Sequence, residues 1–177
     1  MVKWENAVWT GGNLDSVEAQ TQILRAHDTG KNKANGWSLW GTDGVDYDDF
    51  DQGKIGNCYM ISGAATVAEK PERIVKVFDN EDLNEEGFYQ VNLYKLGSPI
   101  KIQVDDRLPM NINSGLLYAR SGPDFSLAGP LLEKAFAKFY GNYEVLIGGN
   151  AGVAMSCITG SPSYTEYFTG ETEDEIW

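Results

Sequence analysis

Residues 59–68, YMISGAATVA, constrain the fold most strongly, because they are small or apolar on nearly every side of a helix. A helix of this composition is stable only when other elements cover several of its faces. A chain of 177 residues is long enough to build that cover within one domain. The sequence therefore predicts a buried central helix with Cys58 at its amino-terminal end.

In the remaining segments, the spacing of apolar residues predicts a hairpin and further helices. Residues 88–94 and 100–104 alternate as the strands of a hairpin, with residues 95–99 as its loop. Gly129-Pro130 opens a second amphipathic helix that ends at Gly141, and its apolar stripe consists of Leu131, Leu132, Ala135, Phe136 and Phe139. Shorter helices are expected over residues 17–26 and 72–78, and glycine-rich coil around residues 148–149. This order of elements indicates an α+β fold.

Charge and cysteine content narrow the classes of partner. The sequence has 14 Lys and Arg residues against 26 Asp and Glu residues, a formal net charge of −12. Such a chain repels nucleic-acid phosphates and favours cations, of which calcium is the first to consider. No stretch approaches the length of a membrane span, and the first residues lack the apolar core of a signal peptide. The two cysteines cannot form a disulfide framework, which favours a cytoplasmic protein.

Cys58 lies where a loop meets the predicted central helix. A thiol at this position faces unpaired backbone N–H groups and the positive end of the helix dipole, which favour the thiolate needed for acyl transfer. Gln52 lies just upstream, and the glycines between the two residues allow its side-chain amide to turn back towards an oxyanion formed near Cys58. From the residues alone, a small structural cysteine stays open as an alternative.

Four segments, in order, resemble the calpains, which are intracellular cysteine proteases of the papain-like class. They are QGKIGNCYMISGAA at residues 52–65, VDDRLP at residues 104–109, LLEKAFAKFYGNYE at residues 131–144 followed by Gly148-Gly149, and Thr159-Gly160. The resemblance extends over roughly residues 37–170. It implies a papain-like α+β half-domain and an activity on peptide or protein substrates.

The resemblance assigns roles to four residues. Cys58 matches the nucleophile and Gln52 the oxyanion donor, whereas Gly148 and Gly149 match backbone that lines the substrate cleft. Without side chains, such a pair allows an extended peptide to lie close. The alternative for the glycine pair, which stays open, is that it only connects a helix to a loop. Asn57 and Tyr59 replace the Asp and Trp that usually flank the cysteine.

A cysteine protease also needs a histidine that moves the proton and an Asn or Asp that orients this histidine. In papain-like chains both follow the cysteine by about 130–150 residues. That window begins beyond Trp177, and the one histidine, His27, precedes Cys58. We therefore predict an amino-terminal extension over residues 1–36, the cysteine-bearing subdomain over residues 37–177, and no His- and Asn-bearing subdomain. The chain by itself is expected to be inactive.

The resemblance further implies a calcium site that differs from an EF-hand. Backbone carbonyls of Thr42 and Gly44 and the carboxylate of Asp49 match its ligand positions. Ser126 stands where a glutamate ligand is usual, and Asp124 is the nearby acid that can take its place. A serine hydroxyl is a poorer calcium ligand than a carboxylate, so reduced affinity is expected. A solvated acidic loop without a specific ion stays open as the alternative.

Two hypotheses of function follow. The first is a calpain-like endopeptidase half that is completed by a protein partner supplying the second half. The second is a non-catalytic calpain-like subunit that docks in a larger assembly, such as the cytoskeleton. The missing histidine favours the second hypothesis, as do the tryptophans near the amino terminus, Trp4, Trp9, Trp37 and Trp40, which are expected to pack on the core or on a partner.

Overall fold

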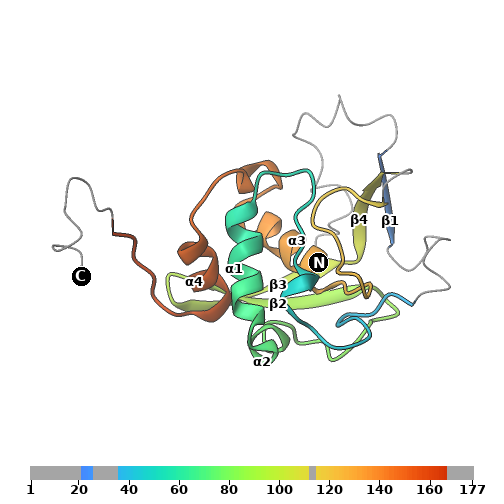
Figure 1. The fold of residues 1–177 in the computed structure, drawn as a ribbon, viewed down its shortest axis with the longest axis horizontal. Helices are drawn as coiled ribbons and strands as arrows, with labels where there is room; N and C mark the ends of the chain where they lie inside the picture. The colour runs from blue at the N-terminus through green and yellow to red at the C-terminus, as the bar shows by residue number, and fades with distance from the viewer. Residues whose placement is uncertain (1–20, 26–35, 112–114, 167–177) are drawn as a thin grey trace.

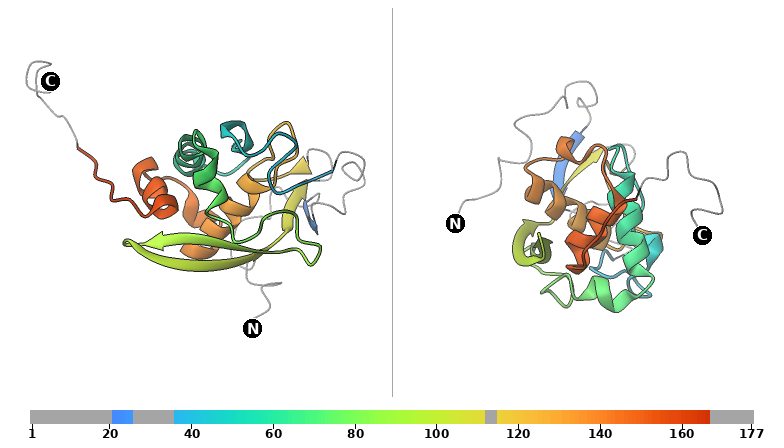
Figure 2. Two further views of the ribbon diagram at one scale, coloured as in Figure 1. Left: turned by 90° about the horizontal axis from the view of Figure 1, so that it is seen from below. Right: turned by 90° about the vertical axis from the view of Figure 1, so that its left-hand side faces the viewer.

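The computed structural model describes residues 21–25, 36–111 and 115–166. Its helices are α1 (Cys58–Ala68), α2 (Pro71–Val75), α3 (Ala128–Tyr140) and α4 (Ala151–Thr159), with short 3-10 helices η4 (Tyr47–Asp49) and η5 (Glu144–Leu146). Its strands are β1 (Thr21–Arg25), β2 (Phe88–Lys95), β3 (Ser98–Asp105), β4 (Arg107–Asn111) and β5 (Gly115–Leu116). The helices lie over one side of the β2–β3 hairpin (Figure 2), which confirms the α+β fold.

Helix α1 is the central element of this arrangement (Figure 1). It packs against α2, α3, α4 and η4. A Cβ atom on Gly63 would lie 3.2 Å from the Ala151 carbonyl oxygen and from the Ala154 Cβ atom, so a glycine at this position permits the close approach of α4. The predicted burial on several faces is confirmed by the buried residues Met60, Ile61, Gly63, Ala64, Val67 and Ala68.

The hairpin forms as predicted, with a tighter turn than expected. Strands β2 and β3 pair antiparallel from Phe88 opposite Asp105 to Lys95 opposite Ser98. Leu96 and Gly97 both have positive φ angles, 50° and 78°, which is the backbone of a two-residue type I′ turn. Along β3 the apolar residues Ile100, Ile102 and Val104 are more buried than their neighbours, which confirms the predicted face.

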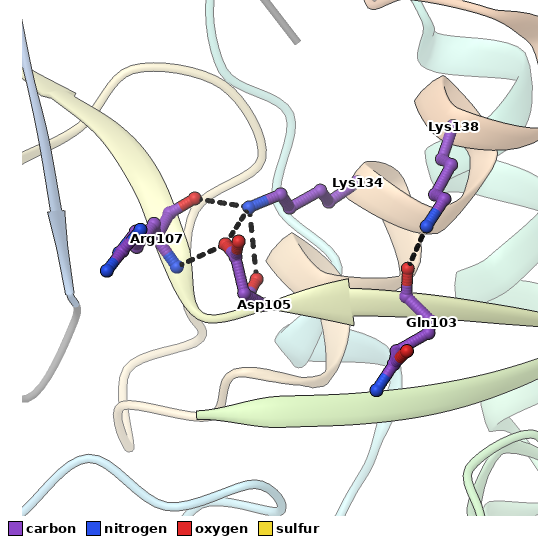
Figure 3. Close-up of polar contacts among 5 residues, drawn as sticks. All are labelled: Gln103, Asp105, Arg107, Lys134 and Lys138. Carbon is purple, nitrogen blue, oxygen red and sulfur yellow. Dashed lines mark hydrogen bonds and ion pairs between the residues drawn. The ribbon is translucent and has the colours of Figure 1, made fainter. Parts of the chain in front are cut away.

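Helix α3 is buried on all sides over residues 128–137, whereas the sequence predicted burial of only one apolar face. The buried Lys134 ammonium donates to the Asp105 carboxylate at 2.5 Å, to the Asp105 carbonyl at 3.1 Å and to the Arg107 carbonyl at 2.5 Å (Figure 3). These bonds hold the bend between β3 and β4 against α3. One turn later, Lys138 donates to the Gln103 carbonyl (Figure 3).

The predicted helix over residues 17–26 is wrong where the structure describes it. Residues 21–25 form β1, which pairs antiparallel with β4 from Thr21 opposite Asn111 to Arg25 opposite Arg107. The spacing of apolar residues in TQILR fits both a helix and a strand. Pairing with the free edge of β4 favours the strand. The rest of the predicted helix lies outside the described residues. The division at residue 36 stays a prediction.

Helix α4 was not predicted from the sequence, and it follows the glycine-rich coil expected around residues 148–149. The Asn150 side chain accepts from the N–H groups of Gly152 at 2.8 Å and Val153 at 3.3 Å, and so caps the helix. Gly160 ends it with φ 75°. These two end signals are visible in the sequence. Helix α2 is also shorter than predicted, because it ends at Val75.

The two described tryptophans pack on this chain's own core. Trp37 is 8% exposed and meets Phe125 edge to face at 5.7 Å. Trp40 meets Phe78 in the same way at 5.4 Å, and its indole N–H donates to the Glu81 carbonyl. Trp4 and Trp9 lie outside the described residues. Within the described ranges, no helix has both the length and the apolar character to cross a bilayer.

Candidate active site

Cys58 is the first residue of α1 and is exposed, whereas Cys157 is buried. The Asn57 carbonyl accepts from the N–H groups of Met60 at 2.9 Å and Ile61 at 3.2 Å, which starts the helix directly before the thiol. The first N–H groups of a helix have no acceptor within it. The Cys58 sulfur therefore lies at a helix end whose backbone donors can stabilise negative charge.

The loop that carries Gln52 is held by its neighbours. The Arg120 N–H donates to the Asp51 carbonyl at 2.9 Å, and the Lys54 N–H donates to the Leu117 carbonyl at 3.1 Å. The Gln52 side-chain nitrogen donates to the Ile55 carbonyl at 2.6 Å, within the same loop. An amide NH2 group has two hydrogens, so one remains for another acceptor. The role of Gln52 as oxyanion donor stays a prediction.

The structure brings the glycine pair next to the residues on both sides of Cys58. The Gly148 N–H donates to the Gly56 carbonyl at 2.9 Å. A Cβ atom on Gly149 would lie 2.5 Å from the Tyr59 ring, so this ring packs directly on the Gly149 backbone. Gly148 has φ +74° and open space on its Cβ side. Gly148 thus presents bare backbone, whereas Tyr59 covers one side of Gly149. The role of this pair in substrate binding stays a prediction.

A buried polar network behind Cys58 was not predicted from the sequence. The Asn57 side-chain nitrogen donates to Glu133 Oε1 at 2.7 Å, and the Ala119 N–H donates to Glu133 Oε2 at 2.9 Å. Glu133 is 1% exposed, so it fixes Asn57, the residue before Cys58, to α3. The available signal was Glu133 itself, an acid that directly follows the apolar residues Leu131 and Leu132.

Burial raises the pKa of Glu133 to about 7, although the bonds from Ala119 and Asn57 oppose this shift. Between pH 4.5 and 7 the folded chain therefore holds a proton that the unfolded chain has lost, so stability falls as the pH rises and levels off above 7. The measurement is the free energy of urea unfolding at several pH values in this window. We expect Glu133→Gln to reduce its fall between pH 4.5 and 7 by up to about 3 kcal/mol. The exposed Glu86→Gln serves as the control. An unchanged slope in Glu133→Gln contradicts this assignment.

The candidate calcium ligands lie in one acidic loop. Asp49, in η4, is 2% exposed, and its carboxylate accepts from the Asp46 N–H at 3.1 Å. Burial raises the pKa of Asp49 to about 7, with the neighbouring Asp124 adding to the shift. The Asp124 carboxylate accepts from the Thr42 N–H at 2.9 Å and from the Ser126 N–H at 3.3 Å. The structure thus brings Asp124 next to Thr42 and Asp49, whereas its role as a substitute calcium ligand stays a prediction.

Ser126 lies beside the acidic loop, where its side-chain hydrogen bond to Asp49 lowers the pKa of that carboxyl against the effect of burial. Its hydroxyl donates to the Leu39 carbonyl at 3.2 Å and accepts from the Ala128 N–H at 3.3 Å. In the described part of the chain, no group of three or more His, Cys, Asp or Glu residues is arranged to hold a metal ion. The carboxylates of Asp49 and Asp124 form an all-oxygen donor set that fits calcium only when carbonyl oxygens of the loop, such as those of Thr42 and Gly44, complete it.

Comparison with known proteins identifies the family. A family model described as calpain family cysteine protease matches residues 6–177. The chain is 31% identical to Calpain-5 of Mus musculus over 130 residues, which are 68% of this chain and 20% of that protein. It is 34% identical to Calpain clp-1 of Caenorhabditis elegans over 122 residues, which are 67% of this chain and 16% of that protein. The chain thus matches a fifth or less of these relatives, and it belongs to the calpain family of cysteine proteases.

Proposed function

We propose that this chain is the nucleophile-bearing half of a calpain-like endopeptidase that cleaves protein substrates. The observation that supports it most directly is the exposed Cys58 at the start of α1, two residues after Gly56, whose carbonyl accepts from the N–H of the open Gly148 backbone. A substrate strand lying along this backbone presents its carbonyl carbon to the Cys58 sulfur. The free state of both cysteines is consistent with a reducing, cytoplasmic setting, which we include in the proposal.

The proposed reaction is acyl transfer. The Cys58 thiolate attacks the peptide carbonyl carbon, and the resulting oxyanion accepts hydrogen bonds from the Cys58 N–H and the Gln52 side chain. Collapse of this intermediate breaks the C–N bond and leaves an acyl-enzyme, while the leaving amine takes the proton that came from the thiol. Water then releases the acyl group. The reaction requires a histidine that carries this proton, and residues 59–177 contain none.

The test uses the chain alone and the chain joined to the His- and Asn-bearing half of a calpain relative. We expect no casein hydrolysis by the chain alone and measurable hydrolysis by the joined protein. Cys58→Ala is expected to lower the rate of the joined protein by at least about 10³-fold, because the nucleophile is lost. The matched control is Cys157→Ala, which removes the buried thiol and is expected to retain hydrolysis.

Two results would contradict this proposal. Hydrolysis by the chain alone that survives Cys58→Ala would show that Cys58 is not the nucleophile. A folded joined protein that has an intact Cys58 but no hydrolysis would favour the non-catalytic docking subunit.

We also propose that calcium binds the acidic loop and regulates this half. The support is the contact between the buried Asp49 and Asp124, whose like charges a divalent cation offsets. The carbonyl oxygens of Thr42 and Gly44 would complete the ligand set. When bound, the ion supplies positive charge that holds the loop to the segment before α3, and no step of the hydrolysis passes through it.

Calorimetric titration with calcium chloride tests this site. We expect weak binding, in the range of about 10⁻⁴–10⁻³ M, because only two carboxylates contribute. Asp49→Asn and Asp124→Asn are each expected to abolish the heat, whereas Asp82→Asn, an exposed acid outside the loop, retains it. Absence of heat in the unmodified chain, or equal heat in all three variants, contradicts the proposal.

A further inference from the structure

A cavity lies away from the candidate active site, at the other end of α1. Its volume is about 460 Å³, and it is bounded by α1, α2, β2, α4 and the segment that follows α4. Val67, near the carboxyl-terminal end of α1, lines it. Cys58 lies nine residues earlier, about 14 Å away along the helix axis. None of the residues assigned to hydrolysis or to calcium contributes to this cavity.

The charged groups of the cavity are exclusively cationic. Arg73 and Lys76 line it, and no Asp or Glu does, although acids outnumber bases 26 to 14 in the sequence. Neither side chain forms an ion pair with any residue that the structure describes. Both project from α2 and the turn after it, next to each other on one edge of the cavity. In an acidic chain, such a pair of cations is a local site for an anion.

The other lining residues are mainly hydroxyl groups and an apolar floor, together with the Asn92 amide, which donates to the Asp79 carboxylate at 2.7 Å. Ser156, Ser161 and Ser163 contribute hydroxyls that form no hydrogen bond elsewhere in the described chain. Thr159 also lines the cavity, but its hydroxyl donates to the Met155 carbonyl at 2.8 Å. The apolar lining consists of Val67, Val77, Tyr94, Met155 and Ile158.

The walls are fixed by packing within the chain. The Tyr94 ring lies against Gly160, where an added Cβ atom would come within 2.8 Å of the ring. The Asn150 side chain donates to the Thr165 hydroxyl at 2.9 Å and so ties the segment after α4 back to the start of that helix. The cavity is therefore a defined recess between elements.

We infer that this cavity binds a small phosphomonoester with an aromatic or apolar body. The phosphate would accept hydrogen bonds from Arg73, Lys76 and the serine hydroxyls, since Arg and Lys pair strongly with phosphate oxygens. The body would cover the apolar floor. The volume lies within the range of about 300–1,000 Å³ that is typical of small-molecule sites, and it exceeds what an inorganic phosphate ion fills.

Phenyl phosphate, inorganic phosphate and benzylamine are the probes, titrated into the 177-residue chain by calorimetry at 0.15 M salt. We expect phenyl phosphate to bind, inorganic phosphate to bind at least tenfold more weakly, and benzylamine not to bind. The double variant Arg73→Gln/Lys76→Gln is expected to weaken phenyl phosphate at least tenfold. The control Lys54→Gln/Lys95→Gln removes the same charge from exposed positions outside the cavity and is expected to change the affinity less than twofold.

Three results would overturn the inference. The first is no binding of phenyl phosphate to the unmodified chain. The second is equal weakening in the two double variants, which would make the attraction a property of overall charge. The third is inorganic phosphate that binds as tightly as phenyl phosphate. The cavity would then be a site for free phosphate, and its apolar residues would not contribute to the affinity. Circular dichroism of each variant confirms that the exposed substitutions leave the fold intact.

Discussion

Lys134→Met is expected to lower the free energy of urea unfolding by about 3–5 kcal/mol, because it leaves a buried carboxylate without its cation. The Lys134 side chain is 3% exposed and the Asp105 side chain 15%, so water replaces the lost ammonium poorly. The carbonyl groups of Asp105 and Arg107 lose their donor in the same step. The bend between β3 and β4 is thus left with unpaired polar groups next to α3.

The control for this variant is Lys138→Met, one helical turn along α3 (Figure 3). Lys138 donates to the Gln103 carbonyl near the surface, so its loss is expected to cost about 1 kcal/mol or less. The double variant Lys134→Met/Asp105→Leu is expected to recover part of the stability, because both members of the buried pair are then apolar. Equal losses for Lys134→Met and Lys138→Met would show that the buried pair has no special role.

Gly53→Ala is expected to displace the loop that carries Gln52. An added Cβ atom would lie 1.8 Å from the Tyr118 carbonyl oxygen, which is main chain and cannot rotate away. The loop must therefore move, at a cost of about 1–3 kcal/mol in the free energy of unfolding. In the joined two-half protein we expect casein hydrolysis to fall by about 100-fold, because a shift of about 1 Å misplaces Gln52, which we propose as the oxyanion donor.

Gly56→Ala is the matched control for stability within the same loop. Its added Cβ atom would lie 3.5 Å from Ile147 Cγ2, which is ordinary contact. Neither Gly53 nor Gly56 has a positive φ angle, so the two variants differ in available space and not in backbone strain. The unfolding free energy of Gly56→Ala is expected to stay within about 1 kcal/mol of the unmodified chain. A similar loss in both variants would indicate that the Tyr118 contact is unimportant.

Local sequence patterns predicted the elements that carry the site. The small apolar run after Cys58 predicted α1, and the Gly-Pro start and Gly141 end predicted α3, because helix periodicity and end signals are local properties. The alternation of β2 and β3 was visible for the same reason. The patterns failed at β1, where the spacing of five residues fits both the helix and the strand period, and they missed α4, although Asn150 and Gly160 are end signals for this helix.

The candidate site was predictable only in its residue types. Cys58 and the glycine pair are recognised from the order of motifs, but their proximity depends on the bond between Gly148 and Gly56. The contact of Glu133 with Asn57 joins residues 76 positions apart in the chain. No periodicity encodes such a pairing, because it depends on how α3 packs against the start of α1.

The sequence by itself determined the central helix, the hairpin, the family motifs and the thiol at a helix start. These properties follow from side-chain type and local backbone preference. Only the tertiary structure decided that Lys134 and Glu133 are buried with their partners, that Asp124 joins Asp49, and that Arg73 and Lys76 face a common cavity. Each of these depends on long-range packing, which sets burial and therefore fixes the partner and the charge state of a polar group.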